Sequence, residues 1–105
     1  MPRKTKTKRI CPVHPGEVLL EEYLLPLELS QNALARSLSV PPRRINEIVL
    51  GKRRLTADTA LRLARYFGTT AELWMSLQTG YELELAKDDL GDRLKKEVAQ
   101  RRRAG

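Results

Sequence analysis

The stretch that decides the fold is residues 30–54, SQNALARSLSVPPRRINEIVLGKRR. Its first part repeats apolar residues at the spacing of one helix face. Ser30 precedes them and offers a side-chain oxygen to the free amides at the start of a helix. We therefore predict a short helix over about residues 31–37. Its buried face comprises Leu34, Ala35 and Leu38.

A second helix follows after a short turn. Pro41 and Pro42 lack amide protons, which is harmless only in the first turn of a helix, so the sequence predicts a helix from there to about Leu50. Gly51 is suited to end this helix. The buried face of the second helix comprises Ile45, Ile48 and Val49.

The polar side chains on the outer face of the second helix are of the types that read DNA. Two short helices joined by a turn of three or four residues form a helix-turn-helix, whose second helix enters the major groove. Arginine pairs with guanine, asparagine pairs with adenine, and glutamate accepts from cytosine. The predicted base-contacting residues are Arg43, Arg44, Asn46 and Glu47. A solvated polar face without a partner is the alternative.

The order and spacing of residues across both helices resemble those of the Cro/XRE-type helix-turn-helix family. The matching pattern is Ser30-Gln31-x-x-Leu34-Ala35-x-x-Leu38-x-Val40, followed by Ile45-x-x-Ile48-x-x-Gly51-Lys52-Arg53. Ser39 stands where the family usually has glycine, and a left-handed turn there is expected to cost roughly 1 kcal/mol. Pro41 replaces the usual Ser or Thr N-cap and so removes a capping oxygen. The resemblance implies a lambda-repressor-like fold.

Contacts to the DNA backbone are expected on both sides of the second helix. Gln31 resembles the family's phosphate-contacting glutamine and would act with the amides at the start of its helix. The basic residues after the second helix are placed to contact phosphate rather than bases. The predicted backbone-contacting residues are Gln31, Lys52, Arg53 and Arg54. An ion pair from Arg53 or Arg54 to an acidic residue, Asp58 or Glu47, is the alternative, and both roles can coexist.

Three further helices are predicted around this pair. The first follows Pro15-Gly16 and ends before Pro26. The next lies between Thr56 and Gly68, and the last begins at a capping box of Thr69 and Glu72 and continues to about residue 87. Their apolar stripes comprise Leu20, Tyr23, Leu24 and Leu27; Ala60, Leu63, Ala64 and Phe67; and Leu73, Leu77, Tyr81 and Leu85, widened by Trp74 and Met75. The predicted fold class is all-α, a single small domain of five or six helices.

Composition narrows the class of protein. A chain of 105 residues has room for one small domain, and 41% hydrophobic with only 5% aromatic residues is typical of a helical core. One cysteine, Cys11, and one histidine, His14, are too few for a disulfide or a structural zinc site, so we expect no metal or cofactor. No apolar run approaches the roughly 18 residues that span a bilayer, which predicts a cytoplasmic protein without a membrane contact. No phosphate loop, nucleophile elbow or carboxylate pair predicts an enzyme.

Charge is divided unevenly along the chain. The net charge is +7, which favours a polyanionic partner. Residues 30–66 carry eight basic and two acidic groups, whereas residues 67–92 carry one basic and six acidic groups. We predict a basic flexible N-terminal arm over residues 1–12, a DNA-binding domain over residues 13–90 with the helix-turn-helix at about 30–51, and a basic C-terminal helix or tail over residues 91–105. The arm is either a solvated terminus or a supplementary phosphate contact.

A closer resemblance extends over about residues 13–86. His14-Pro15-Gly16-Glu17, the string LSQNALARSLSVPPRRINEIVLGKR and the string TADTALRLARYFGTTAELWMSLQTGYELELA resemble the HigA/VapI family of antitoxins. The resemblance implies a dimeric antitoxin that neutralises a RelE-like ribonuclease toxin, HigB, and represses its own operon. The runner-up is a stand-alone Cro-type repressor without a toxin. An RNA-associated basic adaptor is disfavoured because the basic segments contain no stacking aromatics.

The partners implied by the family suggest further site residues. A two-fold dimer sets its recognition helices about 34 Å apart and so predicts a palindromic operator of double-stranded DNA. The possible dimer-interface residues are Leu73, Trp74, Leu77 and Tyr81. The possible toxin contacts are Glu82 and Glu84, in an acidic block that could face a basic ribonuclease. A solvated helix face is the alternative for this block.

Overall fold

The computed structural model describes residues 12–102, which form six helices and no strand. The first is one continuous helix made of α1 (Pro15–Val18), a π-helical segment η1 (Leu19–Leu24) and α2 (Leu25–Leu27). The others are α3 (Gln31–Leu38), α4 (Pro42–Val49), α5 (Ala57–Phe67), α6 (Ala71–Leu90) and α7 (Arg93–Glu97). The prediction of an all-α domain of five or six helices is confirmed. The predicted N-terminal arm lies, except for its last residue, outside the described residues.

The helix-turn-helix forms where the sequence predicts it. Ser30 Oγ accepts from the Ala33 amide at 3.0 Å and so caps α3. Ser39 ends α3 in the left-handed conformation, with a φ of 59°. Pro41 is the N-cap of α4, whose first residue is Pro42. Local rules of capping and proline geometry therefore account for both helices of this pair.

The first helix continues past Pro26, so the prediction that it ends before this residue is wrong. In η1 the Leu25 amide bonds to the Leu20 carbonyl, five residues back. This wider turn accommodates a proline, whose ring and missing amide proton disrupt a regular helix. It also changes the phase of the buried face, because Leu19 and Leu24 are buried while Leu27 is exposed.

Helix α6 begins one residue later than the predicted capping box implies. Thr70 is the N-cap, and its Oγ1 accepts from the Leu73 amide at 3.1 Å. Thr69 Oγ1 instead accepts from the indole Nε1 of Trp74 at 2.8 Å. The buried indole needs a hydrogen-bond partner, and this need selects between two adjacent threonines that fit the sequence equally well.

The buried face of α6 is turned by one position from the predicted stripe. Trp74 and Gln78, four residues apart, are 0% and 1% exposed, whereas Leu73 and Leu85 are exposed. Trp74 lies in an aromatic cluster, because the ring centroids of Tyr23 and Trp74 are 5.1 Å apart. The apolar core comprises Leu19, Leu24, Leu34, Ala35, Leu38, Val40, Ile45, Ile48, Leu55, Ala60, Leu63 and Trp74.

A glycine lets α1 lie directly against α4. A Cβ on Gly16 would stand 1.8 Å from the Ile48 carbonyl oxygen, so no side chain fits there. His14 caps α1, since its Nδ1 accepts from the Gly16 amide at 2.9 Å. The buried His14 ring also meets the edge of Tyr81, with centroids 4.8 Å apart. Through Gly16 and His14, the start of α1 thus contacts both α4 and α6.

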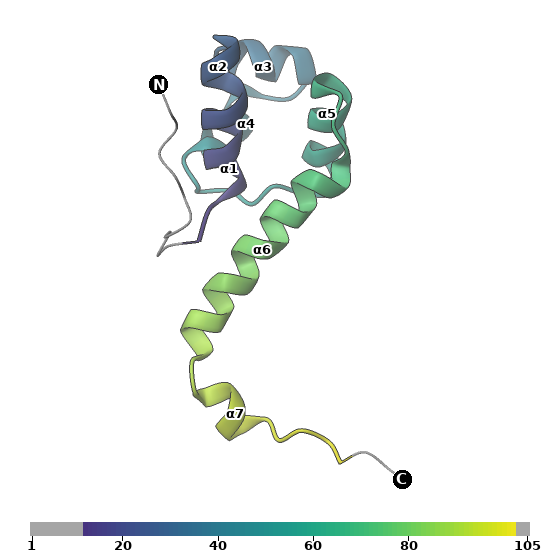
Figure 1. Ribbon diagram of the computed structural model, residues 1–105. Helices are drawn as coiled ribbons and strands as arrows, with labels where there is room; N and C mark the ends of the chain where they lie inside the picture. The colour runs from purple at the N-terminus through teal and green to yellow at the C-terminus, as the bar shows by residue number, and fades with distance from the viewer. Residues whose placement is uncertain (1–11, 103–105) are drawn as a thin grey trace.

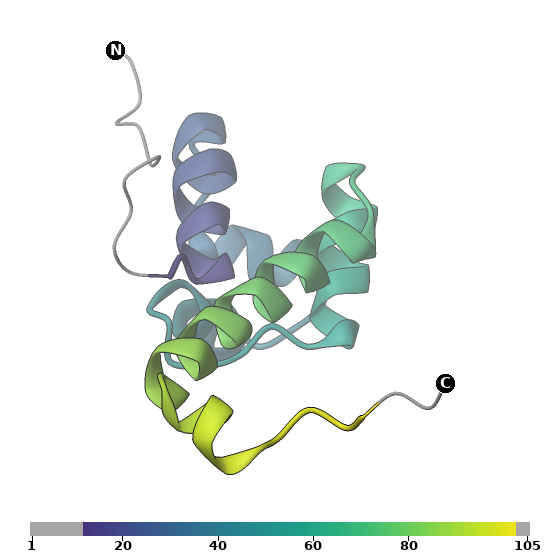
Figure 2. The same cartoon turned by 60° about the horizontal axis from the view of Figure 1, so that its bottom comes forward.

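Helix α6 extends out of the domain. Figures 1 and 2 show its first half beside α5, and Figure 1 shows its second half running away from the other helices to the short α7. From Glu82 to Asp89 every residue is exposed. These eight residues of helix are about 12 Å long, so they present roughly two turns to solvent. No helix in the described part of the chain is long and apolar enough to cross a membrane.

Candidate nucleic-acid interface

The outer face of α4 carries an ion-pair chain. Arg43 Nε donates to Glu47 Oε2 at 2.8 Å, across one turn of the helix. Arg53 Nε donates to the other oxygen, Glu47 Oε1, at 2.8 Å. Hydrogen bonds from Arg43 and then Arg53 hold the pKa of Glu47 below its usual value. The Arg43 side chain is 80% exposed and that of Glu47 only 26%, so the carboxylate orients a guanidinium that faces solvent.

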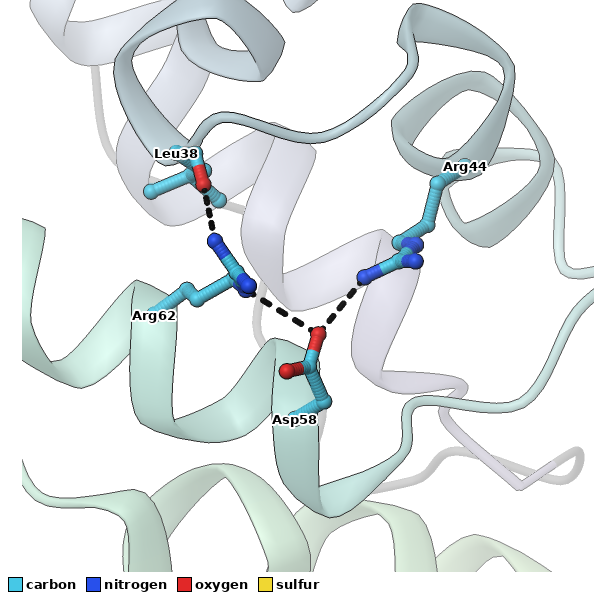
Figure 3. A network of polar contacts seen from close by, with 4 residues as sticks. All are labelled: Leu38, Arg44, Asp58 and Arg62. Carbon is cyan, nitrogen blue, oxygen red and sulfur yellow. Dashed lines mark hydrogen bonds and ion pairs between the residues drawn. The ribbon is translucent and has the colours of Figure 1, made fainter.

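Arg44 turns from the outer face toward α5. Its Nη1 donates to Asp58 Oδ2 at 2.7 Å, and Arg62 Nε donates to the same oxygen at 3.0 Å (Figure 3). Arg62 Nη1 also donates to the Leu38 carbonyl at 2.8 Å, at the end of α3. Hydrogen bonds from Arg62 and then Arg44 lower the pKa of Asp58. This network connects α3, α4 and α5.

Gln31 and Asn46 contact each other across the helix pair. Asn46 Nδ2 donates to Gln31 Oε1 at 2.6 Å, and both residues are half-buried. The contact joins the first turn of α3 to the middle of α4. It brings the predicted phosphate-contacting glutamine and a predicted base-contacting asparagine to one place on the surface, while their roles at DNA stay predictions.

The segment between α4 and α5 is held by α6. Gln78 Oε1 accepts from the Leu55 amide at 2.7 Å, in a buried hydrogen bond. Gln78 Nε2 donates to Glu82 Oε2 at 2.8 Å, and Arg54 Nε donates to the same carboxylate oxygen at 2.9 Å. Hydrogen bonds from Arg54 and then Gln78 lower the pKa of Glu82.

The predicted ion pairs of the basic segment are found in part. Arg53 pairs with Glu47, as the alternative for this arginine required. Asp58 pairs with Arg44 and Arg62 instead of Arg53 or Arg54. The Asp58–Arg62 pair has the four-residue spacing of a helical ion pair, so this spacing alone could have predicted it. Gln78 had no such signal, because a buried glutamine looks like any other polar residue in a hydrophobicity pattern.

Arginine side chains converge on a hollow beside α4. A cavity of about 320 Å³ lies between the first turn of α4, the segment that follows α4 and the start of α5. Its lining residues are Arg44, Arg53, Arg54, Thr56, Asp58 and Thr59. Lys52, which precedes Arg53 in the sequence, is exposed. The surface around α4 thus combines exposed cations with a rigid polar helix face, as a nucleic-acid interface requires.

The residues predicted for protein partners lie on α6. Trp74 is 0% exposed within the single chain, so its assignment to a dimer interface is corrected: the indole belongs to the core. Leu73 is 40% exposed, and Leu77 and Tyr81 are half-buried. Glu82 is engaged by Arg54, whereas Glu84 contacts Lys87 at 3.5 Å. Among the described residues no group of His, Cys, Asp or Glu is arranged to hold a metal ion.

Comparison with known proteins identifies the family. The sequence matches the helix-turn-helix family over residues 20–74. It is 58% identical over 77 residues to virulence-associated protein I of Dichelobacter nodosus, a match that covers 73% of this chain and 71% of that protein.

Two solved structures agree with this match. The fold superposes on an addiction module antidote protein of the HigA family from Coxiella burnetii with a TM-score of 0.83 and 44% identity, covering 88% of this chain and 100% of the other. It superposes on Pseudomonas aeruginosa antitoxin HigA, solved with the higBA promoter, with a TM-score of 0.80 and 44% identity over 83% of this chain and 95% of the other. The chain therefore belongs to the Cro/XRE-type helix-turn-helix family, in its HigA/VapI antitoxin branch.

Proposed function

We propose that the chain is a sequence-specific DNA-binding antitoxin that represses its own operon. The observation that carries the DNA-binding part is the outer face of α4, where an exposed Arg43 is oriented by Glu47 beside the basic residues 52–54. Arg43, Arg44, Asn46 and Glu47 read base edges in the major groove in this proposal, and Arg44 exchanges its contact with Asp58 for DNA. Gln31, Lys52, Arg53 and Arg54 contact phosphate. The relative that was solved with the higBA promoter supports the DNA-binding part of the proposal.

The protein acts on DNA as a dimer in this proposal. Two copies related by a two-fold axis place their α4 helices about 34 Å apart, one turn of DNA, on a palindromic operator. Leu73, Leu77 and Tyr81 remain candidates for the contact between copies, because Leu73 is exposed and the other two are half-buried. Sedimentation analysis of wild-type protein and of Leu73→Asp tests this arrangement: the variant is expected to be monomeric, and an unchanged dimer would move the interface elsewhere.

The second activity is the neutralisation of a ribonuclease toxin of the HigB/RelE type by direct binding. Membership of the antitoxin branch supports it, as does the exposed acidic half of α6, which suits a basic nuclease surface. The test is expression of the neighbouring small reading frame, alone and together with this chain. Growth arrest that is relieved by a co-purifying complex is the expected result. A harmless neighbour and no complex would contradict the antitoxin activity.

A stand-alone repressor without a toxin is the second candidate. The Arg54–Glu82 pair favours it, because this acidic residue already has a cationic partner within the chain. A change at Glu84 therefore tests the toxin contact without breaking the Arg54–Glu82 pair. Glu84→Lys is expected to weaken the complex with the toxin at least tenfold without changing DNA affinity. Glu82→Lys is expected to change both affinities, because the introduced lysine also repels Arg54.

A further inference from the structure

Arg54 and Leu55, two consecutive residues after α4, both bond to one short stretch of α6. The Leu55 amide donates to Gln78 Oε1, and the Arg54 guanidinium donates to Glu82 Oε2. Gln78 donates to the same Glu82 oxygen with its other end, at 2.8 Å. Backbone, buried amide, carboxylate and guanidinium therefore form one chain of hydrogen bonds from the DNA side of the domain to α6.

The hydrogen bonds at the two ends of this network differ in strength. Gln78 is 1% exposed, and its contact with Leu55 is a buried backbone hydrogen bond, which is costly to break. The Arg54 and Glu82 side chains are 53% and 45% exposed, and exposed ion pairs are weak. The Leu55 end is therefore a fixed anchor, whereas Arg54 can leave Glu82 without disturbing the core.

Arg54 has competing acceptors when DNA is present. A guanidinium binds phosphate and carboxylate in the same way, through N–H groups directed at two oxygens. Arg54 is among the residues that line the cavity beside α4, and in the proposed function it contacts a phosphate. A phosphate at this position and Glu82 therefore compete for one side chain.

We propose that Glu82 is a positioning residue of the DNA interface: it holds Arg54 against α6 and so lowers the affinity of the domain for the DNA backbone. This inference rests on the proposed DNA binding and adds to it a link to the exposed half of α6. Binding of DNA releases a carboxylate on α6, and a cationic protein segment that took this carboxylate would release Arg54. Because linkage is reciprocal, such a partner and DNA strengthen each other's binding.

The test compares two isosteric changes on the same helix in the full chain. Glu82→Gln and Glu84→Gln remove the same charge, but Glu84 contacts Lys87 rather than Arg54. Dissociation constants are measured for a duplex from upstream of the protein's own gene and for a scrambled duplex, at about 0.15 M salt, where distant charges are screened. Glu82→Gln is expected to bind both duplexes about two- to fivefold more tightly than Glu84→Gln, because Arg54 contacts phosphate and not bases.

Two further measurements complete the experiment: the same comparison in a background that lacks Arg54, and an NMR measurement on the protein without DNA. With Arg54→Gln added, the two glutamine variants are expected to bind DNA equally. In NMR spectra without DNA, the Arg54 Hε proton is expected to exchange with solvent faster in Glu82→Gln and unchanged in Glu84→Gln. Equal affinities of the two single variants would overturn the inference alone. If no variant and no wild-type protein binds either duplex, the proposed DNA binding fails, whatever the NMR signal shows.

Discussion

Ser39 is the residue at which the turn between α3 and α4 carries strain. Its φ of 59° is a left-handed conformation that costs a residue with a Cβ about 1 kcal/mol more than glycine. Ser39→Gly is therefore expected to raise the free energy of unfolding by about 1 kcal/mol, measured by chemical denaturation. Ser37→Gly makes the same chemical change at an exposed position inside α3 and is expected to lower the free energy of unfolding by about 0.5 kcal/mol. Equal effects of the two changes would contradict this account.

Gly16 is the residue on which the contact between α1 and α4 depends. A methyl group there would stand 1.8 Å from the Ile48 carbonyl oxygen, which belongs to backbone and cannot rotate away. Gly16→Ala is expected to lower the free energy of unfolding by about 3 kcal/mol. Gly80→Ala in α6 is the matched control, because no described atom lies within 4 Å of the added methyl group apart from its chain neighbours and the adjacent backbone of its own helix. Gly80→Ala is expected to raise the free energy of unfolding by up to about 1 kcal/mol. A much smaller loss of stability in Gly16→Ala would show that α1 can move away from α4.

At the scale of single elements, α4 determines the specificity of the proposed function. Arg43→Ala is expected to weaken binding to the operator about 5- to 100-fold and to reduce the preference over scrambled DNA, because a base contact is lost. Lys87→Ala removes the same charge from α6, far along the chain from α4, and is expected to leave that preference unchanged. Titrations of both duplexes measure the ratio. An equal loss on the two duplexes would make Arg43 a phosphate contact.

The elements that the sequence predicts well are those with local start and stop signals. Ser30, Pro41 and Gly68 set the ends of α3, α4 and α5, because a cap, a proline and a left-handed glycine act within one turn. The first helix and α6 differ from prediction because tertiary packing decides them. Packing of Leu19 and Leu24 accompanies a π-helical turn, and the buried Gln78 has no apolar signature.

The same division holds for the candidate site. Residue type and helical spacing identify Arg43 and Glu47 on the outer face of α4, and they allow the Arg53–Glu47 pair. They cannot show that Arg44 turns toward Asp58, since this contact depends on how α4 and α5 cross. The Arg54–Glu82 contact spans 28 residues of sequence, and only the folded chain brings its partners together.

At the scale of the whole molecule, His14 joins three parts of the fold. It caps α1, bonds to the backbone of Arg53 after α4, and packs on Tyr81 of α6. Burial lowers its pKa below the ordinary 6.5, and the hydrogen bond to Arg53 opposes this shift only in part. Protonation at Nδ1 would also remove the acceptor that caps Gly16.

The sign of the resulting pH dependence follows from the lowered pKa. As the pH falls, the unfolded chain binds the proton first, so the free energy of unfolding decreases below about pH 6.5 until the folded pKa is passed. His14→Asn keeps a capping acceptor but does not titrate. Denaturation at pH 7.5 and at pH 5.5 is expected to show a larger loss in the wild type than in this variant. The same loss in both would assign the pH dependence to other groups.

The central claim is that α4 reads a specific operator, and one binding measurement tests it most directly. Wild-type protein is titrated at physiological salt against DNA from upstream of its own gene and against a scrambled duplex of equal length and composition. We predict at least about 1,000-fold tighter binding to the upstream DNA, with two protected half-sites about one helical turn apart. Equal affinity for the two duplexes would contradict the account.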